Sequence, residues 1–238
     1  MIRQLYFTIF IFYLFSLCAC GQTKIIIPPE FIETVEPKAG SEEWIQLNHS
    51  QNEFKVENVE GQLKVTNITE GNNIELKISD GTLLGINRGE FGGVLKFIPF
   101  DTTGKEIEIK KGNIEFIFYF KDKIYFIEGL AHMGYSSGAL FKLETESKDF
   151  KYAKVIEFDD APEAFKIFKD KFLIAGYESF YVIEDFKKNI VLKETFWGGL
   201  YPNSIAAFDN KNIFIGLRSG IVKLDLTTKE TKFYKYAV

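Results

Sequence analysis

The sequence predicts an all-β domain built from a repeated unit of four strands, and three observations support this prediction. Aromatic residues make up 16% of the chain, with 25 Phe and 11 Tyr, and they favour the pleated, half-buried surface of a sheet. Apolar and polar residues alternate with period two along much of the chain, and no long stretch has the period of an amphipathic helix. Polar turn signals recur at regular intervals between the strand-like runs.

Four polar turns mark the repeat. They lie at Asp80, Asp122, Asp170 and Asn210, at intervals of 42, 48 and 40 residues. Each turn joins two strand-like runs, a loop and a third run follow, and an outer strand precedes the next unit. Periods of about 40 to 50 residues built from four strands are typical of β-propeller blades. Four such units therefore cover residues 74–234.

Residues 44–68 and 231–235 supply further alternation, which predicts either a fifth blade or part of one closed by the C-terminal segment. Pairing of the two chain ends would remove exposed sheet edges. We therefore expect residues 44–238 to form a β-propeller of four-stranded antiparallel blades, about five in number. The alternative is another all-β form, either an open antiparallel meander or a β-sandwich.

The repeat over 74–234 resembles propeller proteins of the WD-like and quinoprotein-like type in its rhythm alone. The His and Trp-Asp signature of true WD repeats is absent from this sequence. The resemblance therefore implies a fold and no named functional family.

Bulk composition limits the class of function. Hydrophobic residues make up 46% and charged residues 26% of the chain, as in ordinary globular domains. The net charge is −4, and it would become −5 if residues 1–19, which include Arg3, were removed as a signal peptide. We therefore expect no nucleic-acid partner. Both cysteines, Cys18 and Cys20, lie at the end of the leader. The folded domain therefore has no internal disulfide, thiol nucleophile or Cys-based zinc site.

Residues 1–19 have the pattern of a secretory signal peptide. Arg3 gives a positively charged start, and residues 6–19 carry no charge; this run is shorter than the roughly 20 residues of a membrane-spanning helix. The run ends in Leu17-Cys18-Ala19-Cys20, which resembles the lipobox of bacterial lipoproteins. The resemblance implies cleavage before Cys20 and acylation of that residue, for example with palmitate. The membrane would then be a partner through lipidated Cys20, because two or more acyl chains anchor a protein firmly.

Residues 20–43 contain three of the six prolines of the chain and are expected to form a tether after the lipidated Cys. No Asp follows Cys20, and no acidic run follows it either. By analogy with other lipoproteins, the expected location is the cell membrane or the outer membrane, facing the periplasm.

The predicted blades place a set of loops on one face of the domain. Loops between second and third strands, and links between units, would emerge there, where propellers bind ligands. The candidate ligand-binding residues are Arg88, Glu90, His132, Tyr135, Glu178, Trp197, Tyr201 and Arg218. Arginine side chains beside aromatic rings could hold a carboxylate, a sugar or a peptide segment.

No catalytic set is evident in the sequence. His49 and His132 are the only histidines, and no Gly-x-Ser-x-Gly motif is present, so we assign no catalytic residue, metal ligand or cofactor. The predicted function is a lipid-anchored cell-envelope binding or scaffold protein for an envelope protein or a small ligand. One alternative is a periplasmic hydrolase or lyase with Glu90, Glu128 or Glu178 as acid or base. The other is a toxin-immunity or inhibitor lipoprotein, whose loops the run 88–93 resembles.

Overall fold

The structure is a computed structural model that describes residues 25–68, 74–101, 103–145 and 149–237. The expected signal peptide, Cys20 and the first part of the expected tether lie outside these residues. The described chain is all-β, with one short α-helix, α1 (Glu42–Asn48), and one 3-10 helix, η1 (Gly89–Phe91). Neither of these helices is long and apolar enough to cross a membrane.

Four antiparallel sheets correspond to the four units of the repeat. The first unit forms β4 (Ile74–Lys77), β5 (Gly81–Asn87), β6 (Gly93–Pro99) and β7 (Ile107–Lys111). The second forms β8 (Ile114–Phe120), β9 (Lys123–His132), β10 (Tyr135–Glu144) and β11 (Lys151–Phe158). The third forms β12 (Pro162–Phe168), β13 (Lys171–Gly176), β14 (Phe180–Glu184) and β15 (Lys187–Leu192). The fourth forms β16 (Ser204–Asp209), β17 (Asn212–Leu217), β18 (Gly220–Leu224) and β19 (Thr231–Tyr236).

The polar turns of the repeat all join the first and second strands of a sheet, as the sequence predicts. Two of them use a pair of residues with positive φ, at 48° and 58° for Lys121 and Asp122 and at 50° and 59° for Lys169 and Asp170. This backbone matches the right-handed twist of the flanking strands, so it allows a two-residue hairpin loop. At the last turn, the Asp209 carboxylate instead accepts a hydrogen bond from the Lys211 N–H at 2.7 Å.

The chain ends pair differently from the prediction. The strand β1 (Phe31–Thr34) pairs with β19, with Phe31 opposite Tyr236, and becomes a fifth strand of the last sheet. Residues 31–34 therefore belong to the folded domain, although the sequence suggested a tether over 20–43. The physical reason is burial, because Phe31 is 6% exposed and its ring centroid lies 4.9 Å from that of Phe54.

The segment expected to form or complete a fifth blade is a hairpin of two strands. These strands, β2 (Phe54–Val59) and β3 (Gln62–Asn67), form a sheet of their own. The β2 strand packs beside β16 and β17.

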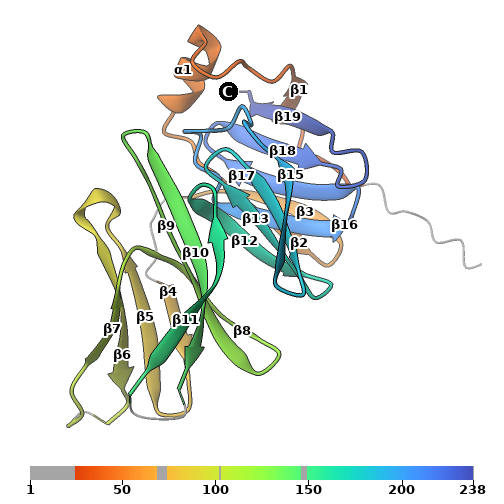
Figure 1. Cartoon of the computed structure of the whole chain (residues 1–238). Helices are drawn as coiled ribbons and strands as arrows, with labels where there is room; N and C mark the ends of the chain where they lie inside the picture. The colour runs from red at the N-terminus through yellow and green to blue at the C-terminus, as the bar shows by residue number, and fades with distance from the viewer. Residues whose placement is uncertain (1–24, 69–73, 102, 146–148, 238) are drawn as a thin grey trace, which may run out of the picture.

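The core lies between consecutive sheets rather than in one central layer. Separate clusters of buried apolar side chains join the first unit to the second, the second to the third, the third to the fourth, and the fourth to the β2–β3 hairpin. Strand β13 contributes side chains to two of these clusters. Phe172 and Ile174 face the second unit, while Leu173 and Ala175 face the fourth. Successive side chains of a strand point to opposite faces, so a continuous apolar run indicates burial on both sides. In Figure 1 the sheets β4–β7 and β16–β19 lie at opposite ends of the molecule.

Candidate functional site

The loop after β5 and the hairpin tip between β9 and β10 come together, and they carry four of the eight candidate residues. Glu90 lies in η1 and His132 ends β9, and the Nε2 atom of His132 lies 2.9 Å from Oε2 of Glu90. Arg88 precedes η1 and is exposed. The Tyr135 hydroxyl accepts a hydrogen bond of 2.8 Å from Ser137. The structure thus joins these two predicted loops.

Large apolar side chains are exposed on the same two loops. Phe91 is 81% exposed, Met133 92% and Tyr135 60%. Met133 has φ 46° and Gly134 has φ 82°, so a two-residue turn places the Met133 side chain at the tip of the hairpin. We call this surface the rim, and it consists of Arg88, Glu90, Phe91, His132, Met133 and Tyr135. The sequence placed Phe91 and Met133 in these loops but gave no reason to select them, because exposure is not visible in a strand pattern.

A cleft of about 540 Å³ lies beside the rim and shares Glu90 and Tyr135 with it. Lys110 forms an ion pair with Glu128 at its wall, and the Lys110 ammonium lies 4.9 Å from the centroid of the Phe141 ring. Glu90 and Glu128 are thus engaged by His132 and Lys110, so neither is positioned as a free catalytic carboxylate. The cleft carries both signs of charge and a partly apolar wall.

Arg218 and Tyr201 form a second group, on the last sheet. The Arg218 guanidinium lies 4.4 Å from the centroid of the Tyr201 ring. It donates to Oε1 of Glu53 at 2.6 and 3.1 Å, and to the carbonyl oxygen of Asn48 at 2.8 Å. These contacts tie α1 and the start of β2 to the loop after β17. The prediction that Arg218 offers a cationic fork to a ligand is therefore not supported by its geometry, because the fork is already occupied.

Trp197 is a core residue, contrary to the prediction that it faces a ligand. Its side chain is 0% exposed and its Nε1–H donates to the carbonyl oxygen of Gly176 at 3.2 Å. It packs in the cluster between the third and fourth sheets, beside Phe196. The α1 helix covers this loop, since Nε1–H of Trp44 donates to the Phe196 carbonyl oxygen at 2.9 Å. Buried indole N–H groups usually find such a partner.

Glu178, the remaining candidate, has an exposed side chain. Its backbone N–H, in contrast, belongs to a buried polar network around Asp160. Its N–H donates to Oδ2 of Asp160 at 2.7 Å, while the Tyr181 hydroxyl donates to Oδ1 at 2.5 Å. Asp160 is 3% exposed and Tyr181 is 0% exposed. Burial, and then the hydrogen bond to Asp160, raise the pKa of Tyr181 well above its usual value.

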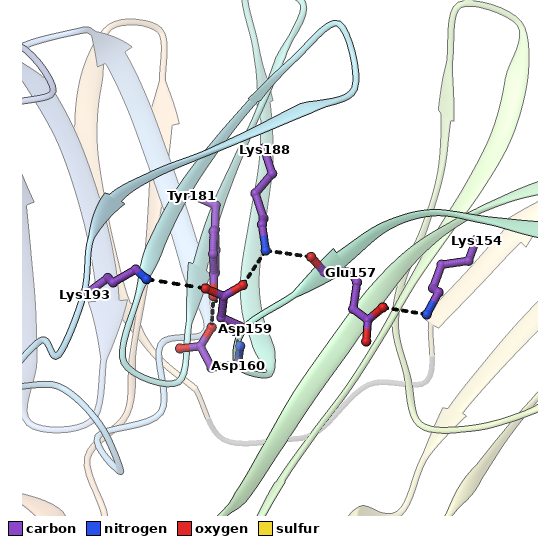
Figure 2. A network of polar contacts seen from close by, with 7 residues as sticks. All are labelled: Lys154, Glu157, Asp159, Asp160, Tyr181, Lys188 and Lys193. Carbon is purple, nitrogen blue, oxygen red and sulfur yellow. Dashed lines mark hydrogen bonds and ion pairs between the residues drawn. The ribbon is translucent and has the colours of Figure 1, made fainter.

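Figure 2 shows how this network continues to the surface. Lys188 lies between Asp159 and the Glu157 carbonyl oxygen, and Lys193 lies 3.6 Å from Asp159 on its other side. The side chain of Asp159 is 47% exposed, in contrast to that of Asp160 beside it. The buried half of the network therefore fixes the link between the second and third sheets, and the outer half is a solvated ion-pair cluster.

Two glutamates at the starts of β8 and β12 were missed by sequence reasoning. Burial raises the pKa of Glu115 to about 8. Burial, and then the nearby charges of Glu115 and Asp160, raise the pKa of Glu163 to about 8. Among the described residues, Oε2 of Glu163 is buried without a hydrogen-bond partner, although the residue as a whole keeps some exposure. Asn87 donates to Glu115 at 2.6 Å. Each of the two glutamates is the second residue of its strand in the structure, and the sequence offered no signal that would have selected them.

The raised pKa of Glu163 predicts a stability that falls as the pH rises. The folded-state pKa of about 8 lies above the usual 4.5, so the folded protein retains a proton that the unfolded chain loses. The resulting stabilisation is complete below pH 4.5 and is lost as the pH rises through 8. From pH 5 to pH 8 we expect Glu163 to contribute a decrease of roughly 3–4 kcal/mol in the free energy of unfolding, measured by urea denaturation.

Glu163→Gln should remove about half of the pH dependence that the two buried glutamates confer, because glutamine does not titrate while Glu115, whose pKa is raised to the same value, still does. The exposed Glu60 provides the control, since Glu60→Gln should leave the slope unchanged. Equal slopes for Glu163→Gln and the wild-type protein would show that Glu163 ionises normally in the folded state.

Within the described ranges, no group of three or more His, Cys, Asp or Glu side chains is arranged to hold a metal ion. No family model matches the sequence, and no curated protein matches it.

Two solved structures have a limited likeness to the chain. The computationally designed Ika8 protein aligns with 71% of this chain and 54% of its own, at 10% identity and a TM-score of 0.41. The apo form of AztD from Citrobacter koseri aligns with 74% of this chain and 51% of its own, at 17% identity and a TM-score of 0.37. The chain thus spans about half the length of each.

Proposed function

We propose that this chain is a lipid-anchored binding protein of the cell envelope, facing the periplasm, and that its rim binds an envelope protein. The lipobox-like end of the leader, with Cys20 as the acylated residue, supports the anchor. The observation that carries the binding role is the gathering of Phe91, Met133 and Tyr135 on two adjoining loops, at 81%, 92% and 60% exposure.

The chemistry of the rim suits a protein partner. Aromatic side chains and methionine are enriched in the buried centres of protein interfaces, where they provide most of the binding energy. Methionine adapts to irregular partner surfaces because its side chain is unbranched and polarisable. The charged pair Glu90 and His132, together with Arg88, borders these apolar side chains as a polar margin. A partner with an apolar, hydrogen-bonding patch would match this arrangement.

A propeller of four-stranded blades is the architecture that we propose for the domain. Its support is the order of strands within each sheet, which follows the chain in all four units. The first strands of successive units also lie beside one another, β8 beside β12 and β12 beside β16. The β2–β3 hairpin, next to β16, would then be an incomplete fifth blade. Rigid blades with variable loops suit a binding role.

Replacement of the three rim side chains by serine tests the proposed binding. The variant carries Phe91→Ser, Met133→Ser and Tyr135→Ser, and mild cross-linking on intact cells is followed by mass spectrometry of the purified, lipidated protein. We expect the cross-linked yield of a partner that the wild-type protein captures to fall by about tenfold or more, since hot-spot residues dominate binding energy.

The matched control removes exposed apolar side chains elsewhere, with Phe100→Ser, Tyr119→Ser and Val59→Ser, at positions 56%, 47% and 45% exposed. Both variants should unfold at the wild-type temperature, because exposed side chains contribute little to stability. Equal capture by the rim variant and the control variant would contradict the assignment of the rim.

A further inference from the structure

Exposed aliphatic side chains also occur at the N-terminal end of the described chain. Ile26 is 67% exposed, Ile32 55% and Val35 87%. Ile25 and Ile27, in contrast, pack against the cluster that contains Phe31. The segment is therefore held on the domain by alternate residues, while Ile26, Ile32 and Val35 project into solvent. Isolated exposed apolar residues are common, but three within ten residues beside an anchor need an explanation.

The distance along the chain from the anchor limits where these side chains can lie. Six residue steps separate Cys20 from Ile26, and a fully extended chain spans at most about 3.6 Å per residue, or roughly 22 Å here. An acylated Cys20 lies at the boundary between the headgroups and the acyl chains. The start of the folded domain would therefore lie close to the bilayer, separated from the acyl chains by little more than the headgroup layer.

Charge near these side chains is largely compensated. Lys232 lies 2.8 Å from Glu33, and Thr231 donates to the Glu36 carboxylate at 2.5 Å. Farther along, Lys235 lies 3.9 Å from Glu43. Glu33 and Glu36 are thus paired with β19, while the exposed Glu30 leaves the segment with only a small negative charge. An apolar contact with lipid is consequently not opposed by a strong local field.

From this reach and this exposure we propose that Ile26, Ile32 and Val35 insert into the interface of the lipid bilayer and fix the orientation of the domain on the membrane. The inference rests on the proposed anchoring through Cys20. Shallow insertion of aliphatic side chains adds to the acyl anchor, because binding at the interface grows with buried apolar area. In Figure 1, β1 lies at the upper right, whereas the loop between β5 and β6 lies at the left and the tip of the β9–β10 hairpin lies at the upper left. This orientation would keep the rim away from the lipid and accessible to a partner.

A thiol-directed fluorophore can test this orientation on the lipidated protein. Cleavage before Cys20 would remove Cys18, and acylation would occupy Cys20, so an introduced cysteine would be the only free thiol. We would label Val35→Cys and, as a matched control, Phe91→Cys, which are two exposed positions at 87% and 81%. Each protein is reconstituted in phosphatidylcholine vesicles containing a lipid with a nitroxide near the headgroup. We expect about a twofold or greater loss of fluorescence at position 35 and little loss at position 91.

Flotation of the same vesicles separates failure of the orientation from failure of the anchor. If the protein floats but position 35 is not quenched, the inserted surface is wrong and the anchor stands. Quenching at position 91 alone would likewise overturn the inference and would place the rim on the membrane. A label at position 35 that is shielded by a second copy in the absence of vesicles would assign this edge to self-association instead. If the protein does not float, the anchor of the proposed function fails and the inference fails with it.

Discussion

Replacement of Trp197 by alanine is expected to lower the free energy of unfolding by about 3–5 kcal/mol, the range for removal of a fully buried large aromatic side chain. Trp197 is 0% exposed and packs between the third and fourth sheets, where Leu47 of α1 joins the same cluster. The substitution leaves a cavity and also removes the donor to the Gly176 carbonyl oxygen. Urea denaturation followed by circular dichroism would measure the change.

Phe91→Ala is the matched control for Trp197→Ala, because it removes an exposed aromatic side chain instead of a buried one. Phe91 is 81% exposed, so its removal should change the free energy of unfolding by less than about 0.5 kcal/mol. The effects on partner capture should run the other way, with a loss for Phe91→Ala and no loss for Trp197→Phe, which keeps most of the buried volume. A Trp197→Phe protein that is stable but fails to bind would restore Trp197 to the ligand-binding face.

Replacement of Asp160 by alanine is expected to cost about 2–4 kcal/mol in the free energy of unfolding, because two buried donors would lose their acceptor. The Tyr181 hydroxyl and the Glu178 N–H both donate to this carboxylate, at 2.5 and 2.7 Å. Figure 2 shows that Asp160 receives the Tyr181 hydroxyl from a neighbouring strand. Asp160→Asn retains one acceptor oxygen, and we expect it to lose roughly half as much stability as the alanine variant.

Asp159 is the control for Asp160 at the adjacent position. Its ion pairs with Lys188 and Lys193 lie at the surface, and such pairs contribute about 0–1 kcal/mol. Asp159→Ala should therefore be nearly neutral in the same denaturation experiment. A cost for Asp159→Ala equal to that for Asp160→Ala would contradict the assignment of the buried oxygen atoms as the stabilising part of the network.

The strands and turns of the repeat were predictable because their causes are local. Period-two alternation reports which residues face a core, and Lys121-Asp122 and Lys169-Asp170 form the two-residue turns that their positions suggest. The pairing of β1 with β19 was not predictable in this way. Its register joins Phe31 to Tyr236 across nearly the whole chain, and a short strand next to several prolines has the same local pattern as a tether.

The candidate site was predictable in part, as a set of loops. The sequence placed Glu90 and His132 in two loops on one face, and the structure brings them to 2.9 Å. It selected Arg218 and Trp197 by residue type, although one is held by Glu53 and the other is buried. Residue type indicates what a side chain can bind, whereas packing decides whether it is free to bind.

The sequence by itself determined the all-β class, the four repeated units, their turns and the lipobox-like pattern of residues 17–20, because each depends on residues close together in the chain. The tertiary structure alone decided which chain ends pair, which aromatic side chains remain exposed at the rim, and which carboxyl groups are buried. Exposure of Phe91 and burial of Trp197 depend on what the other sheets place beside them. The raised pKa of Glu163 has the same origin, since burial and charges from other strands shift its ionisation. Such properties arise from contacts between distant segments, which a local pattern of residues does not encode.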